Sequence, residues 1–220
     1  MGIPSVTVLD HWVNYTDRLT RDGQLALPDM FWVGDRDAER LARQAFTNTP
    51  STLVPNPLFE EMLAQFRRQE TTSSPVHGDR FLVVCEAISE HYATLGPEAA
   101  EIGYDEFDAL RFFLANIDAL SGSVHSITVR PHPHESEAKY VWVTQEFPLL
   151  PLRINKKDTI IAAITDADMV VGCESTALVL GLLAQRRVIC MIPPIGLPCR
   201  LPQESIESLT DLVNPRTGVL

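Results

Sequence analysis

The chain has 220 residues, of which 45% are hydrophobic and 21% charged, and its formal net charge is −11. This length and composition are those of a globular protein with a sizeable core. The acidic balance argues against a general nucleic-acid binder, which needs clustered Lys and Arg. No stretch reaches the roughly 20 apolar residues of a membrane span, and no signal-peptide pattern opens the chain. We therefore expect a cytoplasmic protein.

Apolar runs of strand length alternate with segments of helical period, which predicts an α/β fold with a Rossmann-like parallel sheet covered by helices. In the first part of the chain, strands are expected at residues 6–10, 31–34 and 52–54. Asp35 is a good N-cap for the helix after the second strand. These elements predict a partial N-terminal α/β unit, residues 1–57, which is too small for a complete doubly wound domain. A helix and a polar linker follow over residues 58–77.

The alternation then restarts, so residues 78–220 are predicted to form a Rossmann-like domain with a C-terminal tail. Its strands are expected at residues 81–85, 126–130, 169–172 and 188–192, and a further strand could lie within 140–153. Helices are expected after Asp105, over 158–167 and over 175–184. The Pro-rich tail from Pro193 is expected to include a short helix near Ser205.

The four cysteines form no CxxC pair, and three of them lie in apolar runs. This favours free thiols in a reducing compartment over disulfides or zinc ligands. The residues concerned are Cys85, Cys173, Cys190 and Cys199.

Ligands of open α/β sheets bind beyond the carboxyl ends of the strands. The helix that follows the strand at 169–172 is apolar on nearly every side, so it is expected to be buried with its N-terminal amides at this edge. Glu174, Ser175 and Thr176 open that helix. The two hydroxyls could donate to a phosphate, or Ser175 or Thr176 could simply cap the helix.

Arg130 and His132 end another strand of the same sheet. A guanidinium binds phosphate in a bidentate manner, and an imidazole can donate to phosphate or act as an acid. The alternative is a surface Arg and a His that caps a loop. His132 and His134 also suggest a metal, but no third ligand at a recognisable spacing accompanies them.

Two more polar segments follow predicted strands. Glu86 could accept a hydrogen bond from a ribose or sugar hydroxyl, or be a solvated loop charge. Asp10 and His11 could supply a general base, or be an ordinary loop pair. The chain has no GxxxxGK[ST], GxGxxG or GxSxG motif, which argues against P-loop NTPases, dinucleotide dehydrogenases and α/β-hydrolases.

Together these segments resemble the C-terminal half of GT-B fold glycosyltransferases, in particular capsule and cell-wall polymer transferases. Those families have an R-x-H-P element at a strand end, then an "aD-hydrophobic-hydrophobic-G/T-x-x-S" turn, then a strand introduced by a basic residue. The matching segments here are residues 130–133 (RPHP), 167–176 (ADMVVGCEST) and 186–189 (RRVI). The resemblance covers residues 78–200. Within it, Cys173-Glu174-Ser175 replaces the Ser-Ser element common in these families.

The resemblance implies a metal-independent glycosyltransferase, or its donor-binding half, that uses a nucleotide-activated sugar in surface polysaccharide biosynthesis. It implies phosphate contacts from His132, Ser175 and Thr176 and makes residues 1–57 the end of an acceptor-side domain. We accordingly expect catalysis by Asp10, His11 and His132. Substrate binding is expected at Arg130, His132, Glu86, Glu174, Ser175 and Thr176.

No metal or cofactor is expected, and the partners would be the nucleotide-sugar and a glycan or lipid-linked acceptor. A homodimer or a partner subunit is also expected, because the small first unit should leave an apolar face exposed. One alternative is a nucleotide-sugar 2-epimerase or hydrolase of the same fold. Another is a non-catalytic nucleotide-sugar-binding or scaffold module, and the chain could also be a fragment of a longer gene product.

Overall fold

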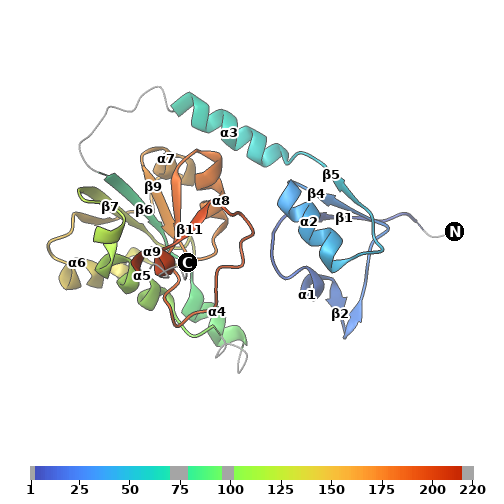
Figure 1. Cartoon of the computed structure of the whole chain (residues 1–220), viewed down its shortest axis with the longest axis horizontal. Coiled ribbons are helices and arrows are strands. Elements are labelled where there is room, and N and C mark those ends of the chain that lie inside the picture. The colour runs from blue at the N-terminus through green and yellow to red at the C-terminus, as the bar shows by residue number, and fades with distance from the viewer. Residues whose placement is uncertain (1–2, 70–78, 96–101, 215–220) are drawn as a thin grey trace, which may run out of the picture. The chain divides into compact units, whose positions relative to one another are not determined.

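The computed structural model describes residues 3–69, 79–95 and 102–214, which divide into two compact units (Figure 1). Unit 1 comprises Met1–Ala64 and Arg200–Gln203, and unit 2 comprises Gln65–Cys199 and Glu204–Leu220. The break falls within helix α3 (Pro57–Gln69), in the segment of residues 58–77 that was expected to be a helix and linker between the units, whereas Arg200–Gln203 were expected in the second unit. Most of the expected linker, from residue 70 onward, lies outside the described residues.

Unit 1 contains a three-stranded parallel sheet in the order β1-β4-β5, made of the three predicted strands. Their bounds are Val6–Leu9, Met30–Val33 and Ser51–Leu53. Helix α2 (Arg36–Ala45) packs against one face and begins at the predicted cap, where the Asp35 carboxylate accepts the Ala38 amide at 2.7 Å.

A short helix and a hairpin between β1 and β4 were not predicted. They are α1 (Tyr15–Leu19), β2 (Thr20–Arg21) and β3 (Gln24–Leu25). The hairpin turns at Asp22 and Gly23, both with positive φ, and an Asp-Gly pair is a strong signal for such a turn. Its strands of two residues are too short to show an alternating pattern.

The second face of the unit 1 sheet presents apolar side chains to solvent. The register places Val6 beside Met30 and Val8 beside Trp32, and the exposed fractions of Val8 and Trp32 are 61% and 42%. Parallel sheets are usually covered on both faces. This is the kind of surface on which dimerisation was predicted, and the dimer itself stays a prediction.

Unit 2 contains a six-stranded sheet in the order β11-β10-β9-β6-β7-β8, in which every neighbouring pair is parallel. The predicted α/β class with a Rossmann-like sheet is therefore confirmed. The strands are β6 (Asp79–Val84), β7 (Val124–Arg130), β8 (Leu152–Ile154), β9 (Met169–Gly172), β10 (Arg187–Cys190) and β11 (Ile206–Ser208).

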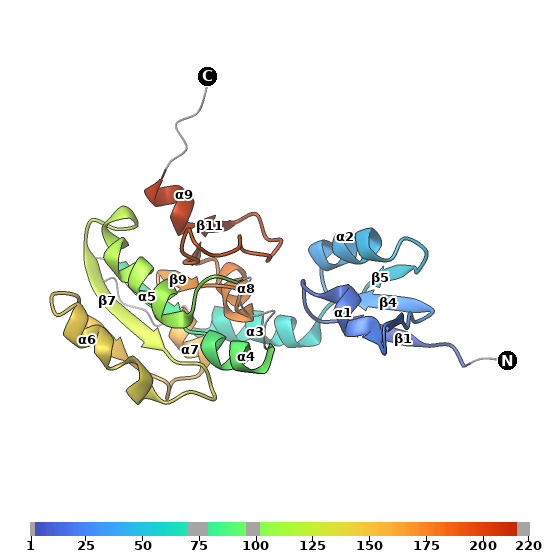
Figure 2. The ribbon, with the colours of Figure 1, turned by 90° about the horizontal axis from the view of Figure 1, so that it is seen from below.

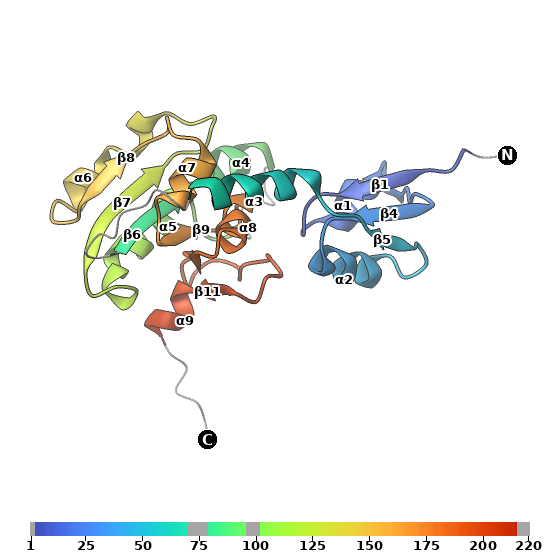
Figure 3. The same cartoon turned by 90° about the horizontal axis from the view of Figure 1, so that it is seen from above.

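Helices cover both faces of this sheet (Figures 2 and 3). On one face, α5 (Glu106–Ala115) packs Phe113 and its neighbours against Phe81 and Ile127. On the other lie α7 (Ile160–Thr165) and α8 (Thr176–Leu183). Helix α8 approaches closely because Gly181 has no side chain: a Cβ there would lie 3.0–3.1 Å from Val188 and Val170.

The remaining elements are short. They are α4 (Ile88–Leu95), the 3-10 helices η3 (Ile117–Ala119) and η4 (Glu137–Tyr140), α6 (Trp142–Glu146) and α9 (Leu209–Val213). A strand was suspected within 140–153, and β8 overlaps only the last two residues of that range and ends at Ile154. Strand β11 was not predicted, because three residues carry almost no periodic signal. None of the helices in the described ranges is long and apolar enough to span a membrane.

Candidate functional site at the carboxyl edge of the unit 2 sheet

Three neighbouring strands of unit 2 end at one edge of the sheet. The register pairs Val84 of β6 with Arg130 of β7, and Val83 with Val171 of β9, so β9 ends at the same level. With strands about 4.8 Å apart, the ends of β7 and β9 are separated by roughly 10 Å across β6. The fold thus brings to one edge all the substrate-binding residues predicted from the sequence: Glu86, Arg130, His132, Glu174, Ser175 and Thr176.

Glu86 follows β6, and its side chain reaches the turn between β9 and α8. Its Oε1 accepts the amide hydrogens of Cys173 at 3.1 Å and Glu174 at 2.8 Å. Burial raises the pKa of Glu86 above its usual value, although the hydrogen bonds from the turn amides act in the opposite direction. Glu86 is therefore not a solvated loop charge, and it already occupies two of the amides that a phosphate could have used.

Ser175 and Thr176 supply the hydroxyls at this turn. Ser175 is the N-cap of α8, and its Oγ accepts the Ala177 amide at 3.2 Å, so the capping role is present. A hydroxyl that accepts a hydrogen bond retains its own hydrogen for donation. Thr176, the first residue of the helix, is exposed. Both hydroxyls can thus still donate to an anion beside the turn.

Arg130 and His132 lie at the end of β7. The guanidinium Nη1 of Arg130 donates to the carbonyl oxygen of Asp158 at 2.7 Å. In the part of the chain that the structure describes, the guanidinium makes no ion pair. The His132 ring is partly exposed, with its centroid 5.3 Å from that of His134. Within residues 3–69, 79–95 and 102–214, no group of three His, Cys, Asp or Glu side chains could hold a metal.

The buried carboxylate of Glu135 fixes the loop that carries His132 by a hydrogen bond to its backbone. Glu135 Oε2 accepts the His132 amide at 3.0 Å and the Tyr140 hydroxyl at 2.8 Å, and the Glu135 side chain is 0% exposed. Lys139 Nζ donates to Glu135 Oε1, and Lys156 Nζ donates to the Glu135 carbonyl at 2.6 Å. The His132 backbone is therefore held in place from inside the protein.

Lys139 also bridges to the β6 side of the edge. Its Nζ pairs with the buried carboxylate of Glu106, which accepts the Ser89 amide at 2.8 Å and the Ser89 hydroxyl at 2.5 Å. Burial opposes the charged forms of Lys139 and Glu106, but hydrogen bonds outweigh it. Those to Glu106 and Glu135 raise the pKa of Lys139, and those from Lys139 and Ser89 lower the pKa of Glu106. Lys139 thus connects η4, which follows β7, to the first turn of α5, which follows β6.

Sequence reasoning missed this network. The i, i+4 spacing of Glu135 and Lys139 is common on protein surfaces, so it gave no reason to expect burial. Glu106, in the first turn of α5, looked like an ordinary acid at a helix N-terminus. Only the contact between distant segments makes these residues part of the edge.

Asp168 of the "aD-hydrophobic-hydrophobic-G/T-x-x-S" segment has a different location. It precedes β9 and so lies at the amino end of the strand, where its carboxylate accepts from Arg80 Nε and Nη2, each at 3.0 Å, and from the Arg80 amide at 2.9 Å. It clamps the starts of β6 and β9 and is remote from the carboxyl edge.

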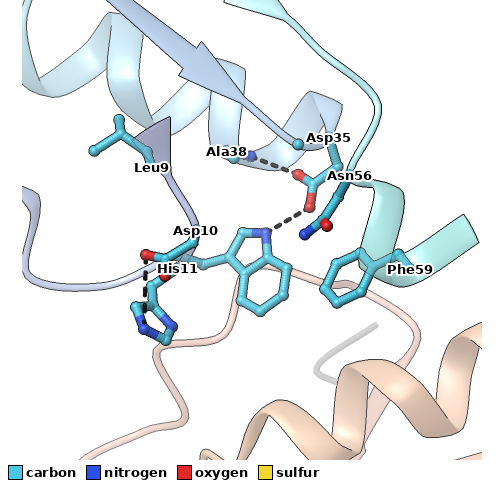
Figure 4. A pocket seen from close by; sticks show the side chains of 9 residues that line it. Leu9, Asp10, His11, Asp35, Ala38, Asn56 and Phe59 are labelled. Carbon is cyan, nitrogen blue, oxygen red and sulfur yellow. Dashed lines mark hydrogen bonds and ion pairs between the residues drawn. The ribbon is translucent and has the colours of Figure 1, made fainter. Parts of the chain in front are cut away.

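The predicted catalytic residues Asp10 and His11 belong to unit 1, where they line a small pocket at the carboxyl ends of its three strands (Figure 4). His11 Nε2 lies 3.7 Å from the Asp10 carboxylate, and both side chains are exposed. In the same pocket, Asp35 accepts the Trp12 indole hydrogen at 2.7 Å and also caps α2. The pocket thus has the exposed polar side chains of Asp10 and His11 at its rim, and a wall in which Asp35 fixes the Trp12 ring.

The four cysteines are free, as predicted. Cys85, Cys173 and Cys190 are buried, and burial raises the pKa of the Cys85 and Cys173 thiols. Neutral, buried thiols of this kind are poor nucleophiles.

No protein-family model matches the chain, and no curated protein sequence matches it. Among solved structures it is similar to KpsC of Thermosulfurimonas dismutans, a beta Kdo 2,4 transferase, with 14% sequence identity and a TM-score of 0.43. The similarity covers 69% of this chain and 48% of that structure. The chain thus spans about half the length of that protein.

Proposed function

We propose that unit 2 binds a nucleotide-activated sugar and is the donor-binding part of a metal-independent, GT-B-like glycosyltransferase of surface polysaccharide biosynthesis. The observation that supports this is the location of the two resembling segments. The R-x-H-P segment with Arg130 and His132 and the turn with Ser175 and Thr176 follow β7 and β9, which flank β6 at one sheet edge.

In this proposal the edge stabilises the departing phosphate of the donor. Breaking the bond between sugar and phosphate leaves negative charge on the phosphate oxygens, and fixed donors lower the energy of that state. Arg130 would leave the Asp158 carbonyl to make a bidentate contact, and His132 would donate from its ring. The hydroxyls of Ser175 and Thr176 complete the donor set, in the place of a metal ion.

The acceptor would be a glycan or a lipid-linked saccharide whose hydroxyl attacks the sugar carbon. In the proposal this proton passes to His11, with Asp10 stabilising the imidazolium that forms. His11 Nε2 lies 3.7 Å from the Asp10 carboxylate, which is within ion-pair distance and longer than a hydrogen bond.

Isothermal titration with CMP-, CDP- and UDP-linked sugars tests the proposal. Saturable binding is expected, and His132→Ala and Ser175→Ala should each weaken it by about tenfold, the value of one charge-assisted hydrogen bond. His125→Ala is the matched control, because His125 lies in the same strand, β7, toward its amino end and is exposed. Absence of binding to every compound, or unchanged binding in both variants, would reject the proposal.

Incubation with a donor, with and without acceptors, separates the related activities. Transfer requires an acceptor, whereas an epimerase or hydrolase consumes the donor alone. A scaffold module would bind the donor and leave it unchanged.

A further inference from the structure

A cavity of about 400 Å³ lies within unit 2, beyond the carboxyl ends of β10 and β11. One wall is the loop of residues 191–199, which carries Pro193, Pro194 and Pro198, and the other wall includes Ser208, Thr210 and Asp211. We name it the proline-loop cavity. Its volume is within the usual range for small-molecule sites.

The loop that encloses this cavity is anchored at both ends. The thiols of Cys190 and Cys199 both donate to the carbonyl oxygen of Cys173, with sulfur-to-oxygen distances of 3.4 and 3.6 Å. The Thr210 hydroxyl donates to the Ile192 carbonyl at 3.0 Å. These contacts and the three prolines hold the cavity in a preformed shape, so a ligand would pay little to order it.

The middle of the loop, at Ile195 and Gly196, packs closely against Gly103 and Tyr104. A Cβ on Gly196 would lie 2.5 Å from the Tyr104 ring, and one on Gly103 would lie 2.6 Å from the Ile195 carbonyl oxygen. Gly103 also has a positive φ of 78°. Gly196 therefore lets the loop backbone pack against the Tyr104 ring, and Gly103 lets the segment before α5 pack against the loop backbone at Ile195, which leaves the cavity wall little room to move.

The cavity adjoins the candidate phosphate site. Strand β10 is the neighbour of β9, with Cys190 beside Gly172 in the register. The Cys173 carbonyl that accepts from the two thiols belongs to the turn that carries Ser175. A ligand bound at Ser175 could therefore extend one part of itself into the proline-loop cavity.

The lining chemistry favours an uncharged ligand group with hydrogen-bond donors over a phosphate. Within the described ranges of the chain, no Lys, Arg or His lines the cavity, which instead combines proline and aliphatic walls with two hydroxyls and the carboxylate of Asp211. That carboxylate has no hydrogen-bond or ion-pair partner among the residues that the structure describes. A carboxylate repels phosphate but accepts hydrogen bonds from amine and hydroxyl groups.

We infer that the proline-loop cavity binds the nucleoside part of the donor and that Asp211 selects a base with an exocyclic amine. This inference rests on the proposed function. Asp211 accepts from an amine, as acidic side chains do with the amine of cytosine, and it is repelled by a carbonyl oxygen at the same place. Cytosine and adenine are thus favoured over uracil and hypoxanthine.

Two pairs of nucleotides isolate this contact. CMP and AMP carry an exocyclic amine where UMP and IMP carry a carbonyl oxygen, and the members of each pair otherwise differ only by the proton on the adjacent ring nitrogen. Titration should show CMP or AMP binding about tenfold more tightly than its partner, the value of one charge-assisted hydrogen bond. In Asp211→Asn the preference should fall to less than about threefold, because an amide both donates and accepts.

A second variant, Leu197→Trp, fills the cavity. It should weaken binding of the favoured nucleotide at least about tenfold and leave binding of ribose 5-phosphate unchanged, since the lost contacts are those of the base. Leu149→Trp is the matched control, because Leu149 is 97% exposed and does not line the cavity. Thermal melts check that all variants are folded.

The outcomes separate the two proposals. If the native protein binds none of the four nucleotides, the proposed function fails and the nucleoside site with it. If it binds them but Leu197→Trp and Asp211→Asn bind them equally well, the nucleoside site is wrong and the proposed function stands.

Discussion

Glu86 Oε1 accepts the amide hydrogen of Glu174 at 2.8 Å, so a carboxylate of the chain itself lies at the turn that opens α8. The turn resembles a phosphate site in sequence, yet part of its positive potential is already balanced by an internal acid. A phosphate beside Ser175 would be close to this negative charge unless Glu86 takes up a proton. The charge state of Glu86 is therefore central to both the stability and the binding properties of the edge.

The variant Glu86→Gln should be at least as stable as the native protein at pH 8. Burial raises the folded-state pKa of Glu86 above its unfolded value, so the folded protein binds a proton at Glu86 more tightly than the unfolded chain does. The stability of the native protein therefore falls as pH rises from the unfolded-state pKa to the folded-state pKa of this group. Glutamine keeps the oxygen acceptor and has no charge to desolvate. Denaturant unfolding at pH 4.5 and 8 should show that the free energy of unfolding of Glu86→Gln increases relative to that of the native protein as pH rises.

The variant Glu86→Ala should instead be destabilised, by about 1–3 kcal/mol for each buried amide left without a partner. The amides concerned are those of Cys173 and Glu174. If Glu86→Ala unfolded at the same denaturant concentration as Glu86→Gln, the two hydrogen bonds would contribute nothing.

Nucleotide affinity should respond to the same charge. Removal of the Glu86 carboxylate eliminates its repulsion of a phosphate at the turn. Glu86→Gln should therefore bind the donor nucleotide about tenfold more tightly. This magnitude is that of one unit charge a few ångströms away, at the effective dielectric constant of a protein surface. Native affinity should also rise as pH falls, and this rise should be shallower in Glu86→Gln. Titration calorimetry over the range from pH 4.5 to 8 measures both effects, and weaker binding by the variant would contradict them.

The sequence was sufficient to predict most of the sheet. Continuous apolar runs such as residues 81–85 and 169–172 form β6 and β9, because a central parallel strand is buried on both faces and needs no alternation. The rule that ligands bind at the carboxyl edge then identified Glu86, His132 and Ser175 as neighbours. Each of these inferences depends on local pattern and on topology alone.

What the sequence could not predict are interactions between segments far apart in the chain. The Glu86 contact to Glu174 spans 88 residues, and the pairing of Lys139 with Glu106 joins η4 to the first turn of α5. Each partner looks like a surface charge in its local context. Burial alone gives these charges their role, and burial depends on packing that no short pattern encodes.

The pair of Arg80 and Asp168 should contribute to stability and not to binding. Hydrogen bonding from Arg80 lowers the pKa of Asp168, so this stabilisation is present above the unfolded pKa and is lost as pH falls through the folded value. Because the Asp168 side chain is 37% exposed, Asp168→Asn should cost only about 1 kcal/mol at pH 7. Unfolding at pH 7 and below pH 3 should show the difference and then its disappearance. Nucleotide affinity should be unchanged, because Asp168 lies at the amino end of β9.

Lys139→Met should be the most damaging single change near the edge. The ammonium group lies between the carboxylates of Glu106 and Glu135, whose side chains are 1% and 0% exposed, and its loss leaves two buried acids without a cation. Breaking a buried ion pair in this way costs about 3–5 kcal/mol. Adding Glu106→Gln to Lys139→Met should recover part of that loss, because one of the two unpaired charges disappears, and a double-mutant cycle in denaturant measures the coupling. A loss below about 1 kcal/mol for Lys139→Met, typical of an exposed ion pair, would show that Lys139 does not hold η4 and α5 together.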